Sequence, residues 1–125
     1  VAPRQPPPPA AFQPEAFPDL PLPPGYVPQP GGDHLAVVLG GGAIRRYHTV
    51  LRQVADEDAD LDQLGDWYRR RLTRAGWTLA DDAWPQRQDW RKRRSATPRA
   101  ERLVLETGRA DGRTIIRLAV APAPD

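Results

Sequence analysis

The first thirty residues, VAPRQPPPPAAFQPEAFPDLPLPPGYVPQP, contain twelve of the sixteen prolines in the chain. Proline fixes φ near about −65° and biases the preceding residue towards extended geometry, so Pro6–Pro9 should form a polyproline II helix. A segment of this composition cannot build a hydrophobic core of its own. The sequence therefore predicts two parts, an extended proline-rich docking arm over residues 1–30 and a small domain over residues 31–125.

The arm also carries apolar side chains that a flexible linker usually lacks. Aromatic and leucine anchors on a stiff backbone lose little conformational entropy on binding, which suits recognition by a groove of a partner. We expect the arm to dock on another protein subunit through Phe12, Phe17, Leu20, Leu22 and Tyr26. The alternative for residues 17–30 is that this half packs on its own domain as a strap.

Two strands are predicted directly after the arm. The apolar run at residues 34–39 favours a buried strand, and the glycines at 40–42 favour a hairpin turn into a second strand over residues 43–54. In the second strand every other residue should point into the core, among them Tyr47 and Leu51.

One amphipathic helix is predicted over residues 59–75, where large apolar residues recur at helical spacing. Asp60 can cap its N-terminus with Gln63 as the capping-box partner, and Gly76 suits the left-handed residue that follows a helix. Gly65 lies in the helix interior, where glycine costs about 1 kcal/mol relative to alanine. We expect a neighbour packed closely against Gly65 to be the reason for it.

Four further strands complete the pattern. Residues 77–80 and 88–94 are predicted strands, the second short and exposed with Trp90 pointing inward, and residues 101–109 and 113–121 form a hairpin across an Asp-Gly turn. The expected fold class is α+β. It has an antiparallel sheet in the element order β-β-α-β-β-β-β, one amphipathic helix packed on a face, and the extended arm in front.

Positive charge is concentrated in the second half of the chain. Residues 1–68 hold four arginines and nine carboxylates, a balance of −5, whereas residues 69–117 hold fourteen basic and six acidic residues, a balance of +8. Residues 87–102 are especially rich in arginine. A second partner-binding patch is predicted at Trp84, Arg87, Trp90, Arg91, Arg93 and Arg94.

Several partners fit such a basic patch. An acidic protein surface or anionic lipid headgroups suit it best. Nucleic acid is a weaker alternative, because arginines beside an aromatic residue can grip phosphate and stack on bases but no nucleic-acid-binding motif is present. A plain solvated surface needs no partner at all.

No constellation of residues points to catalysis, a metal or a cofactor. His34 and His48 are the only histidines, and a metal site would need a third ligand such as Asp33, so two unrelated histidines are the simpler interpretation. The chain has no cysteine, which excludes disulfides and thiolate metal sites. The longest apolar run, Leu35–Leu39, is far shorter than the roughly 20 residues of a membrane-spanning helix.

Three stretches carry a resemblance to a known class of proteins: PLPPG at 21–25, RRYHT at 45–49 and WYRRRLTRAGW at 67–77. Together, over residues 21–80, they resemble small exported bacterial cell-envelope domains, many of them lipoproteins. The resemblance implies a periplasmic or cell-envelope location and no particular activity. The cysteine that would carry a lipid anchor is missing from the sequence.

The start of the sequence agrees with export, because Val1-Ala2-Pro3 is the kind of end that removal of a signal peptide leaves. We expect a non-catalytic accessory subunit, without cofactor, that binds other subunits of a larger membrane-associated assembly through its arm and its basic patch. The alternative is a module that binds nucleic acid or anionic headgroups through residues 87–102.

Overall fold

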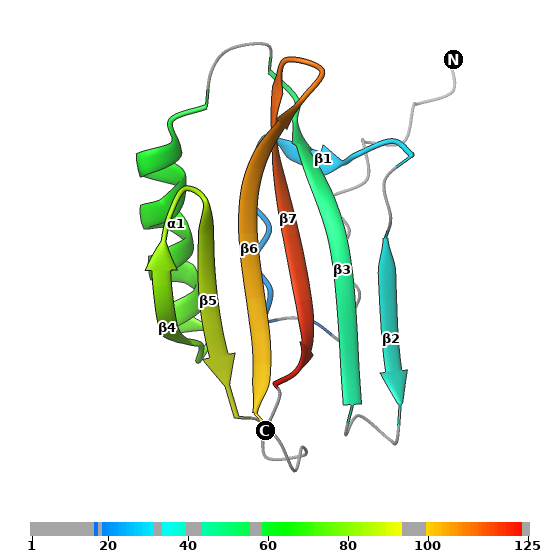
Figure 1. Cartoon of the computed structure of the whole chain (residues 1–125), viewed down its shortest axis with the longest axis vertical. Helices are drawn as coiled ribbons and strands as arrows, with labels where there is room; N and C mark the ends of the chain where they lie inside the picture. The colour runs from blue at the N-terminus through cyan, green and yellow to red at the C-terminus, as the bar shows by residue number, and fades with distance from the viewer. Residues whose placement is uncertain are drawn as a thin grey trace, which may run out of the picture.

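The computed structural model describes residues 17, 19–31, 34–39, 44–55, 59–93 and 100–123. In these residues seven strands form one antiparallel sheet, and a single helix lies against one of its faces (Figure 1). The α+β fold class predicted from the sequence is confirmed.

The elements along the chain are β1 (Tyr26–Pro28), β2 (Leu35–Leu39), β3 (Ile44–Gln53), α1 (Leu61–Arg74), β4 (Thr78–Ala83), β5 (Arg87–Lys92), β6 (Glu101–Ala110) and β7 (Arg113–Pro122). The strand order is β1-β3-β7-β6-β5-β4, and β2 also pairs with β3. Both β1 and β2 lie along the edge of β3 that β7 leaves free, β2 at its start and β1 at its end. Strand β1 was not expected, because it lies within the proline-rich segment.

The turns and caps follow the local chemistry of the sequence. Asp111 and Gly112, with φ of 53° and 76°, join β6 to β7 in the two-residue turn that suits an antiparallel hairpin. The side chain of Asp60 accepts a hydrogen bond from the backbone nitrogen of Gln63 at 3.0 Å, as expected for the helix N-cap. Gly76 follows α1 with φ of 97°, a conformation that favours glycine.

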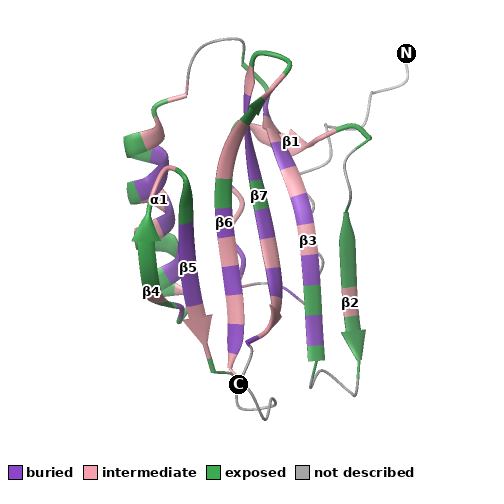
Figure 2. Cartoon of the chain, in the orientation of Figure 1, coloured by how far each residue is buried: buried purple, intermediate pink, exposed green. Residues whose placement is uncertain are grey.

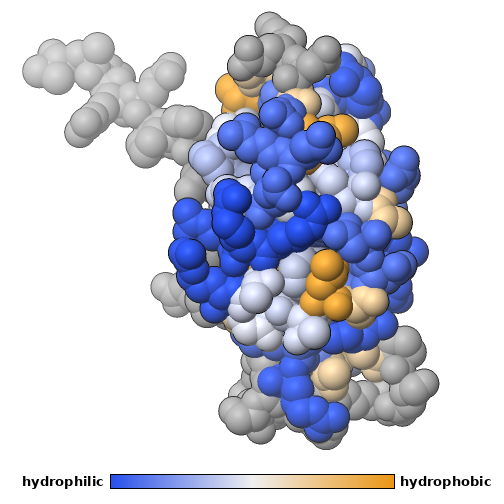
Figure 3. All heavy atoms as spheres, turned by 90° about the vertical axis from the view of Figure 1, so that its left-hand side faces the viewer, coloured by the Kyte–Doolittle hydropathy of each residue, from blue (hydrophilic) through white to orange (hydrophobic). Residues whose placement is uncertain are grey.

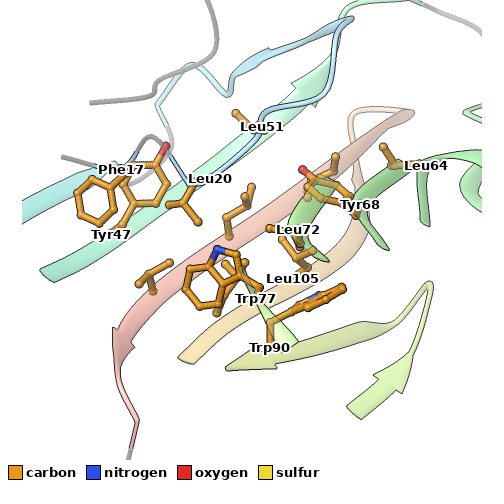
Figure 4. Packing of buried hydrophobic residues seen from close by; sticks show 14 residues of the cluster. Phe17, Leu20, Tyr47, Leu51, Leu64, Tyr68, Leu72, Trp77, Trp90 and Leu105 are labelled. Atoms are coloured by element: carbon orange, nitrogen blue, oxygen red, sulfur yellow. The ribbon is translucent and has the colours of Figure 1, made fainter. Parts of the chain in front are cut away.

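The core lies between one face of the sheet and a cover formed by α1 and the strap, which we define as residues 17–30. Leu64, Tyr68 and Leu72 point from α1 towards the sheet (Figure 4). Phe17 and Leu20 of the strap fill the same layer beside β3, and their side chains are 0% and 1% exposed. The strap passes behind β6 and β7 in the view of Figure 1, on the same side of the sheet as α1.

Three local expectations need correction. The predicted buried strand 34–39 is largely exposed, because α1 and the strap cover other parts of the sheet and β2 lies at its margin (Figure 2). Strand β5 is not an exposed strand, since β4 and β6 flank it and residues 88–90 are buried. Strand β4 continues through Asp81 and Asp82, beyond the end at residue 80 that was predicted for it.

Candidate functional site

The face of the sheet opposite α1 is not covered by any element in the described part of the chain, and we call it the open face. Successive side chains of a strand point to opposite faces, and residues paired across strands share a face. The register therefore assigns side chains to the open face from four neighbouring strands. They are Arg46, His48, Val50 and Arg52 of β3, Ile115, Arg117, Ala119 and Ala121 of β7, Arg102, Val104 and Glu106 of β6, and Arg87, Asp89 and Arg91 of β5.

This face is strongly basic. The residues named above include six arginines, which oppose three carboxylates: those of Asp89, Glu106 and, on β4, Asp81, which pairs with Asp89 in register. The balance leaves an excess of three positive charges on one surface. Between the arginines lie small apolar side chains, of which Val50, Val104 and Ala119 are half-buried.

Three of the arginines converge on the single carboxylate of Asp89. Arg102 donates to it through Nε at 2.7 Å and Nη2 at 2.8 Å, Arg91 through Nη1 at 2.8 Å and Arg87 through Nη2 at 3.1 Å. The hydrogen bonds from Arg102 are the largest cause that lowers the pKa of Asp89 far below its usual range; burial opposes them and Arg91 adds to them. One carboxylate neutralises only one guanidinium, so this cluster holds the arginines in place and remains positive.

The other arginines of the open face have no such partner. Within the described ranges no carboxylate pairs with Arg46, Arg52 or Arg117, although Arg117 lies opposite Glu106 in the register. The Nε atom of Arg52 and the Oε1 atom of Gln29 are buried without a hydrogen-bond partner. A buried donor that lacks an acceptor costs free energy.

The sequence-predicted patch is only partly assembled. Arg87 and Arg91 lie on the open face, Arg93 is exposed just after β5, and Arg94 lies outside the described residues. Trp90 is buried in the core, with its indole nitrogen 3.2 Å from the amide oxygen of Gln88. Of the predicted patch, only arginines therefore lie on the open face.

Trp84 has a different place. It is half-buried against α1, where its indole nitrogen donates to the carbonyl of Leu61 at 2.6 Å. Its ring lies beside Gly65, as the glycine in the helix interior suggested: a Cβ built on Gly65 would be 2.6 Å from Trp84 Nε1. Trp84 thus fastens the β4–β5 turn to the helix.

Four arginines of the open face were not singled out from the sequence: Arg46, Arg52, Arg102 and Arg117. The signal for two of them was present, because Arg46 and Arg52 alternate with the core residues of their strand. Their meeting with Arg102 and Arg117 depends on which strands become neighbours, and local sequence does not contain that information.

The predicted anchors of the arm are mostly used by the protein itself. Phe17 lies against Tyr47, with ring centroids 4.9 Å apart, and Leu20 is fully buried. Leu22 and Tyr26 are partly buried against the core. The second half of the arm therefore packs on its own domain as a strap, which was the alternative to docking on a partner. Phe12 lies outside the described part of the chain.

Asp19 fixes the strap by polar contacts. Its carboxylate accepts hydrogen bonds from Arg45 of β3 and from Lys92 Nζ at 2.9 Å, and its carbonyl accepts one from Trp77 Nε1 at 3.0 Å. Burial raises the pKa of Asp19, but the hydrogen bonds from Arg45 and Lys92 outweigh burial and hold the pKa below its ordinary value. These contacts attach the start of the strap to the sheet.

A pocket of about 560 Å³ lies between the strap and the first half of α1. Its lining includes Pro23, Pro24, Tyr26 and Trp67, together with the polar residues Asp60, Gln63 and Arg70. The described lining contains no Ser, Thr, Cys, Lys or His side chain. His34 is held by Thr49 Oγ1 at 2.7 Å and the Gln29 carbonyl at 3.1 Å, and no group of three metal-ligating residues occurs among the described residues.

Comparison with protein-family models, curated proteins and solved structures returned no match. The helix that the structure describes is too short and too polar to cross a membrane. The function is therefore inferred from the geometry of the described residues.

Proposed function

We propose that this protein is a non-catalytic accessory subunit that binds an acidic protein surface of a larger cell-envelope assembly through the open face. The excess of arginine over carboxylate on this one uncovered face carries the proposal. Arginine suits the task because its planar guanidinium binds carboxylates in two-point geometry and is weakly hydrated.

The layout of the open face favours a protein partner over nucleic acid. Half-buried Val50, Val104 and Ala119 lie between the arginines, which matches the apolar centre and polar rim of protein interfaces. Proteins that bind single-stranded nucleic acid usually offer aromatic rings on which bases stack. In the part of the sheet that the structure describes, no Phe, Tyr or Trp projects from the open face.

Residues 1–16 supply a second contact in this proposal. The strap is held to the domain at Phe17 and Asp19, so residues 1–16, which contain Phe12, are joined to a fixed point on the domain. A stiff polyproline segment reaches about 3.1 Å per residue and loses little entropy when it binds. The exported location proposed for the protein rests on the resemblance to cell-envelope domains.

Binding of defined probes to the full chain tests the role of the open face. The probes are a poly-glutamate peptide, a single-stranded DNA oligonucleotide and phosphatidylglycerol vesicles. The test variant is Arg46→Gln/Arg52→Gln/Arg117→Gln. The matched control removes the same charge from the exposed surface of α1, as Arg70→Gln/Arg71→Gln/Arg74→Gln.

We expect poly-glutamate to bind the control and to lose affinity for the test variant. Three exposed ion pairs at about 0.5 kcal/mol each amount to roughly tenfold. Backbone NMR shifts should map the peptide to β3, β7 and β6. Equal loss in both variants would reduce the effect to net charge, and tighter binding of DNA or vesicles than of the peptide would favour the alternative functions.

A further inference from the structure

Strand β2 forms an apolar edge of the sheet. Its sequence, Leu-Ala-Val-Val-Leu, has no charged or polar side chain, and Leu35, Val38 and Leu39 are 47%, 44% and 54% exposed. Ile44, opposite Leu39 on β3, is 40% exposed and extends the same surface. Among the described elements β2 pairs only with β3, so its other edge presents free backbone donors and acceptors.

The opposite edge of the sheet is protected in the usual way. Strand β4 carries Asp81 and Asp82, and the carboxylate of Asp82 accepts a hydrogen bond from Arg69 of α1 at 2.9 Å. This side of the molecule is predominantly hydrophilic (Figure 3). Charged edges discourage strand pairing between molecules, and strand β2 carries no charged residue.

We propose that β2 pairs antiparallel with β2 of a second copy of this chain and joins the two sheets into one. Five uncharged residues are self-complementary. With the two-fold axis at Val37, Leu35 lies opposite Leu39 of the other copy, and every side-chain pair across the interface is apolar. Such pairs stabilise neighbouring strands, whereas β4 paired with itself would bring aspartates together.

The symmetry of this pairing has a consequence for the open face. The two-fold axis between antiparallel neighbours is perpendicular to the sheet, so the open faces of both copies lie on the same side. Leu35 and Val37 share that side, because they pair with His48 and Arg46. The two Arg46 side chains would be three strand spacings apart, about 14 Å, which exceeds the screening length of about 8 Å at physiological salt.

The experiment measures the mass of the full chain by sedimentation velocity over a dilution series, with circular dichroism as the check of folding. The wild-type chain should rise with concentration from 13.9 kDa to twice that mass. Leu35→Lys/Leu39→Lys should remain at 13.9 kDa, since each lysine would face a lysine of the other copy. Leu35→Glu/Leu39→Glu should remain monomeric for the same reason.

Mixing these two variants gives the sharpest outcome. Lysine then lies opposite glutamate at both positions, so the doubled mass should return as a one-to-one heterodimer. The control Thr78→Lys/Ala80→Lys on the exposed β4 edge should dimerise like the wild type. A wild-type chain that stays monomeric throughout, a lysine variant that still dimerises, or a mixture that stays monomeric would each overturn the proposal.

Discussion

Arg45 and Asp19 form a two-point ion pair although 26 residues separate them in sequence. Arg45 Nη1 and Nη2 donate to the two oxygens of Asp19 at 3.0 and 2.9 Å. Arg45 is 3% exposed and also donates through Nε to Glu101 of β6 at 2.9 Å. One guanidinium therefore holds the strap, β3 and β6 together, with both carboxylates satisfied.

Replacement of Arg45 by alanine should destabilise the fold strongly, because it removes the buried guanidinium that lies between the carboxylates of Asp19 and Glu101. Removing one member of a buried ion pair costs about 3–5 kcal/mol. Urea unfolding measures the loss. Arg46→Ala, one position along β3 and exposed on the open face, is the matched control and should change the free energy of unfolding by less than about 0.5 kcal/mol. Equal effects of the two variants would contradict the network.

Acid should weaken the attachment of the strap in a defined way. The pKa of Asp19 is lowered in the folded protein from its ordinary 3.8, so Asp19 contributes stability at pH values above 3.8. This contribution is lost as the pH falls through the lower folded pKa, when the carboxylate takes up a proton.

The measurement compares the free energy of unfolding of the wild type and Asp19→Asn between neutral and acidic pH. The wild type should be the more stable at neutral pH, and the gap should close in acid. The pKa of Asp89 is also lowered, but Asp89 is present in both proteins and cancels in the difference. A gap that stays constant with pH would mean that the charge of Asp19 does not stabilise the fold.

Two truncations should distinguish the role of residues 1–16 from that of the strap, residues 17–30. Removal of residues 1–16 leaves every core contact of the described structure in place, so the melting temperature should stay close to that of the full chain. Removal of residues 1–30 takes away Phe17, Leu20 and strand β1 and should abolish cooperative unfolding.

A single substitution provides a milder version of the second truncation. Phe17→Ala should cost about 3–5 kcal/mol, the usual range for a buried phenylalanine. Cooperative melting without residues 1–30 would show that the strap is dispensable to the domain.

Gly65→Ala should destabilise the protein although alanine favours helices. The intrinsic gain is about 1 kcal/mol. The new Cβ would approach Trp84 Nε1 to 2.6 Å, and the hydrogen bond of that nitrogen to Leu61 restricts the ring.

The effect should change sign when the ring is removed. In a Trp84→Ala background, Gly65→Ala should become stabilising, because only the helix propensity remains. Thermal unfolding of the four proteins of this cycle measures the coupling. Additive effects would contradict the close contact between Gly65 and Trp84.

Local chemistry allowed much of the fold to be predicted. The cap at Asp60, the left-handed Gly76 and the Asp111-Gly112 turn depend on a few neighbouring residues, and each is found where the pattern indicates it. The alternation in β3 likewise predicted the core side chains Tyr47 and Leu51. The resemblance to envelope proteins and the role of residues 1–16 remain predictions.

Hydrogen bonding, caps and side-chain period act over a few residues, so the amino-acid pattern is sufficient to predict the helix and most of the strands. What each element covers depends instead on contacts between elements. The proline-rich segment packs on the apolar face of the sheet, so Phe17 and Leu20 are buried. The apolar strand β2 extends beyond this contact and is exposed. The arginines of four strands share one face for the same reason: burial and neighbourhood depend on contacts between residues far apart in the chain.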